Sequence, residues 1–412
     1  MTRVAEERRP RPLLRVFLGL ALLLSPARAQ EDSKPEKVET IDPYTRGERK
    51  GLDAAGYVSL GPFPWCEGIT TDAITRELGG LPILWVETEH FRIGSTLQSY
   101  KLSGDRIERK RVDEELARIR DIFPDAKVPT AKLDPWLRLH MYARRIEAVH
   151  AEFLRGFGVQ DQDFGEVKPG SPPTIAAGPH LGMQMKFTVL LAERRSTVAR
   201  FVRYALKRDA SDPIRERLPG GSLFFGISAE TVRSWSQESE SAFHSQVAAN
   251  VALNLLSGFR GMSSTLPVWF EYGYSHVISR RVDERYTLYA KGTLREDGDS
   301  WKWEPRVAGL IANDFAPSWK DLANEKRFED LSGPDHLVAW SKVTWMLQTF
   351  GPERMRQYLM AVTDPLPRQD ELDRAAFLRD RQLRALEEVA GVPTTELEDV
   401  WRRWAAKATS KR

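Results

Sequence analysis

The residues best suited to chemistry lie between Phe243 and Arg281, where two predicted helices follow each other. The first helix contains FHSQVAAN (243–250), and the second begins at LPVWFEYG (266–273). A zinc site of the H-E-x-x-H kind needs two His one helical turn apart, a general-base Glu between them and a third ligand from a later helix. The first helix retains one imidazole, that of His244. The segment therefore has the two-helix arrangement of a zinc site, but it lacks the pair of His ligands.

No alignment with His244 recovers the missing ligands. If His244 is the first ligand, Ser245 takes the place of the general base and Ala248 that of the second His. If His244 is the second ligand, Glu240 replaces the first His and Ser241 replaces the base. Serine cannot act as the proton acceptor near neutral pH, so neither alignment predicts a working base.

A third alignment and the downstream motif give the same result. Shifting by two residues places Gln246 and Asn250 at the His positions. A ligand Glu is expected three residues after Trp269, where the chain has Tyr272, and Glu271 lies one place early. One imidazole holds Zn²⁺ weakly. Loss of a general base costs roughly 10²–10⁴-fold in rate.

Three stretches together resemble the peptidase MA-like group of the gluzincin clan of zinc metallopeptidases. VETEHFRI (86–93) resembles the strand that opens that domain, and the His244 helix with LPVWF (266–270) and Gly273 resembles its zinc helix and the motif that follows. VAGV (389–392) and LEDVW (397–401) resemble its closing helices. The resemblance implies an α+β, zincin-like fold, with a small mixed α/β N-terminal lobe followed by a mostly helical C-terminal lobe.

The histidines allow a structural and a metal-binding interpretation. His244 heads an apolar stripe with Ala248, Val251 and Leu255, which favours a buried structural imidazole. His90 in the strand signature and His140 and His150 on a charged helix are also interpreted as structural. The alternative is a rebuilt zinc site formed by His244, Glu271 and His276.

Three functions follow from these alternatives. The first is a pseudo-metallopeptidase: a non-catalytic binding or scaffolding module without a cofactor, whose groove contains His244, Trp269 and Tyr272 and takes a peptide or a cell-envelope component. The second is an active zinc peptidase that uses His244, Glu271 and His276. The third is a structural envelope protein whose cleft is filled by side chains. The oligomeric state is left open.

The N-terminus predicts export. Four Arg between residues 8 and 15 precede a nine-residue apolar core, Val16 to Leu24, and Ala27-Arg28-Ala29 gives a small-x-small cleavage site. Residues 1–29 are therefore expected to be a signal peptide, and the protein to be periplasmic, cell-surface or extracellular. The apolar core is shorter than the ~20 residues that span a bilayer, and no later membrane span is predicted.

Charge and cysteine content exclude other classes. The formal charge is +3, but residues 1–30 hold six Arg and two Glu, so the rest of the chain is near −1. Without a clustered basic face, nucleic-acid binding is not expected. The single cysteine, Cys66, excludes an internal disulfide framework and is expected to pack beside Trp65.

Composition and periodicity divide the rest of the chain. Residues 30–55 are expected to be a flexible leader, 56–237 an α/β lobe and 238–412 a helical lobe. A strand is expected around 82–93, and Asp134-Pro135 is typical of a helix start, with the helix ending at Gly158. Further helices are expected at 107–123, 196–207, 335–350, 352–362, 371–389 and 395–406, and further strands at 185–191 and 222–227.

Overall fold

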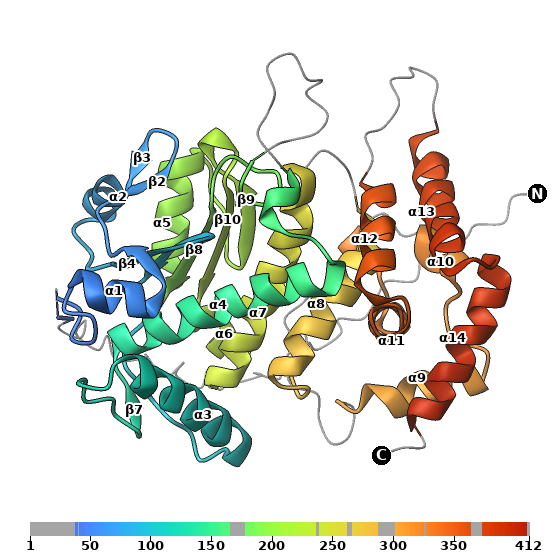
Figure 1. Cartoon of the computed structure of the whole chain (residues 1–412), viewed down its shortest axis with the longest axis horizontal. Coiled ribbons are helices and arrows are strands. Elements are labelled where there is room, and N and C mark those ends of the chain that lie inside the picture. Colours follow the sequence, from blue (N-terminus) through green and yellow to red (C-terminus); the bar gives the residue numbers. More distant parts are fainter. Residues whose placement is uncertain are drawn as a thin grey trace, which may run out of the picture. The chain divides into compact units, whose positions relative to one another are not determined.

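The computed structural model describes residues 38–39, 41–164, 178–235, 239–261, 266–286, 301–324, 327–363 and 373–409. Residues 38–412 form one compact unit. The predicted signal peptide, residues 1–29, lies outside the described residues. The structure is mixed α/β, with one six-stranded sheet and helices on both of its faces (Figure 1).

The main sheet combines parallel and antiparallel strands. Its order is β1 (Tyr57–Ser59), β4 (Leu84–Thr88), β5 (Phe91–Ser95), β8 (Phe187–Ala192), β10 (Leu223–Ser228) and β9 (Ile214–Arg217). Strands β5, β8 and β10 are parallel, whereas β1, β4 and β9 pair antiparallel with their neighbours. Two small ribbons pair β2 (Pro64–Cys66) with β3 (Ile69–Thr70), and β6 (Tyr100–Lys101) with β7 (Lys132–Leu133).

The helices of the first half are α1 (Arg49–Ala55), α2 (Thr71–Glu77), α3 (Arg106–Ile122), α4 (Pro135–Phe157), α5 (Arg195–Leu206) and α6 (Ala229–Ser234). Those of the second half are α7 (Glu240–Gly258), α8 (Val268–Val282), α9 (Trp303–Ala312), α10 (Trp319–Asn324), α11 (Gly333–Thr349), α12 (Gly351–Val362), α13 (Arg374–Ala390) and α14 (Thr394–Thr409). Short 3₁₀ turns are η1 (Asp161–Phe164), η2 (Pro219–Gly221), η3 (Phe259–Gly261) and η4 (Phe328–Asp330). Among these helices, none is both long and apolar enough to cross a lipid bilayer.

The predicted limits of α4 are confirmed. The Asp134 side chain accepts a hydrogen bond from the backbone N–H of Leu137, Pro135 is the first helical residue, and Gly158 ends the helix with φ 58°. Capping satisfies a backbone donor at the start, and glycine adopts the left-handed conformation at the end without steric cost. Cys66 is buried beside the fully buried Trp65, as expected, and burial raises the pKa of its thiol to about 11.

The sheet is covered on both faces. In β8, Val189 and Leu191 join the core cluster that includes α4 and α7, whereas Leu190 and Ala192 join the cluster that includes α2 and α5. Successive strand residues point to opposite faces, so a strand covered on both sides is a nearly continuous apolar run. This explains why all six residues of β8 and of β10 are buried.

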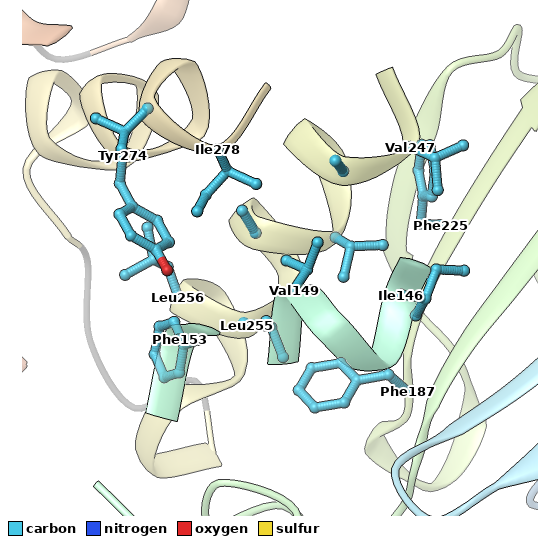
Figure 2. Close-up of a cluster of buried hydrophobic side chains, with 14 of the residues drawn as sticks. Ile146, Val149, Phe153, Phe187, Phe225, Val247, Leu255, Leu256, Tyr274 and Ile278 are labelled. Carbon is cyan, nitrogen blue, oxygen red and sulfur yellow. The ribbon is translucent and has the colours of Figure 1, made fainter. Parts of the chain in front are cut away.

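Helix α7 lies at the centre of the larger core. Its residues are all buried except Ser257. Figure 2 shows Leu255 of α7 close to Val149 and Phe153 of α4, with Ile278 of α8 on another side of the same cluster. A helix apolar on most sides is stable only when it is surrounded. Helix α7 is therefore fixed by its neighbours rather than by one amphipathic face.

Two predictions from the first hundred residues need correction. The predicted strand at 82–93 is a hairpin, in which β4 and β5 pair around Glu89 and His90. The expected flexible leader, residues 30–55, includes helix α1, and the Asp42 side chain is buried, with Oδ1 3.1 Å from Nε2 of His140.

We expect Phe153→Ala to lower the free energy of unfolding by about 3–5 kcal/mol, because its fully buried ring would leave a cavity. Phe315 is 73% exposed and provides a matched control. Phe315→Ala should change stability by less than about 0.5 kcal/mol in urea unfolding. Equal losses in the two variants would contradict the assignment of the core.

Candidate functional site

A cavity of about 260 Å³ opens beside His244, between α3, α4, α7 and α8. Its lining residues come from all four helices and are rich in arginine: Arg111, Glu115, Arg118, Ile119, Met141, Arg144, Arg145, Ala148, Val149, Glu152, His244, Ala248, Ile278, Arg281 and Val282. Lining positions on α4 are three or four residues apart, so that one face of that helix forms a wall.

His244 forms the polar part of the cavity floor. The residue is 8% exposed, and its Nδ1 has no hydrogen-bond partner among the described residues. Burial, followed by the positive charges of Arg145 and Arg111, lowers the pKa of His244 well below its usual 6.5. The imidazole is therefore neutral at pH 7 and can exchange hydrogen bonds without adding charge.

Five arginines and two glutamates line the cavity. Arg281 pairs with Glu152, and Arg111 lies 3.9 Å from Asp283. Arg145 is neutralised by Glu115, whose Oε2 lies 2.6 Å from its Nη2. The exposed guanidinium groups of Arg118 and Arg144 make no hydrogen bond or salt bridge with another described residue. These two groups remain available to an anion at the rim.

Glu240 connects the cavity to the core. Its carboxylate is buried between Arg138, at 3.0 Å, and Arg145, at 2.8 Å. Burial alone would raise the pKa of Glu240, but the two guanidinium groups lower it below its usual value. Glu240 lies four residues before His244 on the same face of α7, so this ion pair holds the start of α7 against α4 and places the imidazole in the cavity.

The three predicted groove residues do not share one surface. Trp269 is 1% exposed, packs edge-on against Trp319, and donates a hydrogen bond from Nε1 to Oε1 of Gln382 at 2.8 Å. Tyr272 packs against Phe328, with ring centres 4.1 Å apart. Neither residue lines the cavity beside His244.

A larger cavity of about 590 Å³ lies near the start of α8, and Gln382 is among its lining residues. Its other lining residues include Leu266, Ala323 and Val362. None of His244, Trp269 and Tyr272 lines this cavity, so it is not the groove predicted from the sequence.

The rebuilt ligand set, His244, Glu271 and His276, is not brought together. His276 is fully buried, and its Nε2 lies 3.0 Å from Nδ1 of His336. A helix turns by about 100° per residue, so His276 points away from the face of α8 that brings Ile278 to the cavity. Glu271 is seven residues before Ile278, about 10 Å along the helix axis.

The electrostatics of Glu271 differ from those of the other carboxylates. Burial raises the pKa of this half-buried group to about 7, although the charge of Arg215 lowers it slightly. A carboxyl group with this pKa can hold or release a proton near neutrality. Its position away from His244 gives it no part in the cavity.

The third alignment also lacks ligands in the structure. Gln246 is fully buried, and neither amide atom of its side chain has a hydrogen-bond partner among the described residues. The Asn250 side chain donates to the backbone oxygen of Gln246 at 2.9 Å. Gln246 is two residues from His244, which corresponds to about 200° around α7, and Asn250 follows Gln246 by one helical turn. Both residues therefore point away from the His244 side of the helix.

Sequence reasoning did not find the arginines of the cavity. Arg111 and Arg118 on α3, and Arg144 and Arg145 on α4, look like solvated charges on amphipathic helices. On each helix, the arginines are three or four residues from other cavity-lining residues, which places them on one helix face. This spacing does not show which other helix that face meets. His90, Glu147 and His150 were also not recognised as a group, although Glu147 and His150 have i, i+3 spacing.

No protein-family model, curated protein or solved structure matches this chain. The resemblance to zinc metallopeptidases therefore stays a prediction from the sequence.

Three buried histidines should make stability depend on pH. Burial lowers the pKa of His336 to about 4, and those of His244 and His276 well below 6.5. The unfolded chain takes up these protons below pH 6.5 but the folded chain does not, so stability should fall as pH decreases from 6.5. His244→Gln should reduce the dependence of the unfolding free energy on pH, below pH 6.5, by up to about 1.4 kcal/mol per pH unit. Urea unfolding at pH 7.5, 6.5 and 5.5 provides the test, and parallel curves for wild type and variant would refute it.

Glu271 should make the unfolding free energy depend on pH in the direction opposite to that of the histidines. Its pKa is raised in the folded state, so it contributes stability below pH 4.5 that is lost as pH rises through about 7. Glu271→Gln should abolish this loss, which amounts to at most about 1.4 kcal/mol per pH unit and is reduced by partial exposure. The measured quantity is the difference in unfolding free energy between wild type and variant at pH 5 and pH 8. A difference independent of pH would contradict the shift.

Proposed function

We propose that this chain is an exported, non-catalytic binding protein with a zincin-like fold whose zinc site has been lost. In this proposal the cavity beside His244 receives an anionic group, such as the terminal carboxylate of a peptide or an acidic group of a cell-envelope component. The observation that carries the proposal is an open cavity lined by a neutral imidazole and by two exposed arginines, Arg118 and Arg144, that pair with no other described residue.

The geometry around His244 supports binding over metal-dependent hydrolysis. Ala248, at the position of a second His, lines the same cavity and offers no ligand. Ser245, at the position of a general base, is fully buried and is not among the lining residues. A water molecule in this cavity would lack the paired ligands and base that a zinc peptidase requires.

The size and charge of the cavity support a small anionic group. A volume of about 260 Å³ is somewhat below the ~300–1,000 Å³ of sites that enclose a whole drug-sized ligand. It suits one terminal residue or one acidic substituent. Guanidinium groups bind carboxylates through two parallel hydrogen bonds, and Arg118 and Arg144 are placed at the rim for this interaction.

The two other functions have less support. An active peptidase that uses His244, Glu271 and His276 would require side chains on different faces of α8 to meet. A structural envelope protein with a filled cleft agrees with the buried Trp269. It does not account for the open cavity beside His244 or for the arginines of its rim.

The proposal predicts that a short N-acetylated peptide with a free terminal carboxylate binds better than the same peptide amidated at its C-terminus. Charge-assisted hydrogen bonds contribute about 1.5–3 kcal/mol each, so Arg118→Ala with Arg144→Ala should weaken binding at least roughly tenfold. Isothermal titration at low and high salt measures both effects.

The control is the double variant Arg354→Ala with Arg403→Ala, which removes two exposed arginines outside the cavity. It should bind like the wild type. Equal affinity for acid and amide, or equal weakening in both double variants, would overturn the proposed anion site. Zinc that is bound stoichiometrically and lost in His244→Ala would instead support the peptidase alternative.

A further inference from the structure

Three side chains that can bind a metal ion meet at the edge of α4, away from the His244 cavity. His90 lies in the turn between β4 and β5, and Glu147 and His150 lie on α4. One ligand atom from each residue lies within 4.8 Å of the other two. Among the described residues, this is the one group of three His, Cys, Asp or Glu side chains with such geometry.

A helix and a hairpin position these residues. Glu147 and His150 are three residues apart, which places them on one face of α4. The β4–β5 hairpin is part of the main sheet, which packs on α4, and it brings His90 to that face. Each ligand thus comes from a hydrogen-bonded element and not from a long loop.

The Glu147 carboxylate is already oriented by neighbouring groups. Its Oε1 accepts hydrogen bonds from Oγ1 of Thr88 at 2.5 Å and from the backbone N–H of His90 at 3.2 Å. Its Oε2 lies 2.7 Å from Nδ1 of His90. Two donors fix one oxygen and leave the other directed at the imidazole, which is how outer partners commonly orient metal ligands.

We propose that His90, Glu147 and His150 bind one divalent transition-metal ion, with zinc as the first candidate. Two imidazole nitrogens and one carboxylate oxygen form a donor set that suits zinc, and Co²⁺ and Ni²⁺ are chemically similar alternatives. Three protein ligands leave a fourth tetrahedral position for water or another small ligand. This site shares no residue with the His244 cavity and does not depend on the function proposed for it.

Side-chain adjustments of about 1 Å would admit an ion. Tetrahedral zinc at about 2.1 Å from each donor separates neighbouring donors by roughly 3.4 Å. The contact between His90 and Glu147, now 2.7 Å, must open by about 0.7 Å, and donors as far as 4.8 Å apart must approach one another. A proton displaced from the His90–Glu147 contact leaves to solvent.

The imidazole rings must also turn. The rings of His90 and His150 are stacked, with centres 3.8 Å apart and planes at 21°. Rotation of the His90 ring would direct its nitrogen toward the ion. The side chains of His90 and Glu147 are 13% and 28% exposed, so an ion can reach them from solvent. His150 is buried at 1% exposure and forms the inner wall of the site.

Metal binding would fasten the β4–β5 turn to α4. The ion would link the sheet and the helix at a point where hydrogen bonds now join Thr88 and His90 to Glu147. Ligands that bind only the folded state raise its stability. Zinc should therefore increase the melting temperature of the protein as well as bind to it.

The test is titration of Zn²⁺ into the purified protein after treatment with a chelator, followed by Co²⁺ absorption spectroscopy. We expect one ion per chain and visible Co²⁺ bands of tetrahedral coordination. Glu147→Gln and His150→Ala should each abolish stoichiometric binding and the rise in melting temperature. Glu147→Gln keeps the size of a partly exposed side chain, so it tests the site even if His150→Ala fails to fold.

Two further variants distinguish this site from zinc binding elsewhere on the protein. Thr88→Val removes a hydrogen bond to the ligand carboxylate and should weaken zinc binding roughly 10–100-fold. His244→Gln removes a histidine of the other cavity and should leave zinc affinity unchanged. Zinc binding that survives Glu147→Gln in a folded protein, or its absence in the wild type, would overturn the proposal.

Discussion

The buried carboxylate of Glu240 is the interaction on which the arrangement of the described residues depends. It lies between the guanidinium groups of Arg138 and Arg145 at the point where α7 begins. Removing one member of a buried ion pair leaves an uncompensated charge and typically costs about 3–5 kcal/mol. Here one carboxylate lies between two guanidinium groups, and Glu193 and Glu115 supply further negative charge beside them. The helix that this cluster anchors passes through the larger core cluster.

A second set of contacts supports the same helix start. The Glu108 carboxylate of α3 accepts hydrogen bonds from the Ser239 hydroxyl at 2.6 Å and from the backbone N–H of Ser241 at 3.2 Å. Helix α3 thus meets the N-terminal end of α7, where a negative charge is also favoured by the helix dipole. These contacts join α3, α4 and α7, three of the four helices that line the cavity beside His244.

Helix α4 takes part in both proposed sites. Arg145 and Val149 face the cavity, whereas Glu147 faces the hairpin that carries His90; the cavity residue Arg144 lies three residues before Glu147 on the same helix. The two proposed sites therefore lie on neighbouring faces of one helix. Its fixed position explains how residues close in sequence can serve two separate chemistries.

The sequence by itself determined the local structure. Asp134, Pro135 and Gly158 specify the limits of α4 because capping and backbone conformation are local, and the apolar run of β8 specifies a buried strand. The sequence also showed that no alignment with His244 supplies paired zinc ligands. Only the tertiary structure decided that α1 packs onto the fold, that His276 pairs with His336, and that arginines of α3 and α4 surround His244. These outcomes depend on which helix faces meet, and the energy of such contacts comes from residues far apart along the chain.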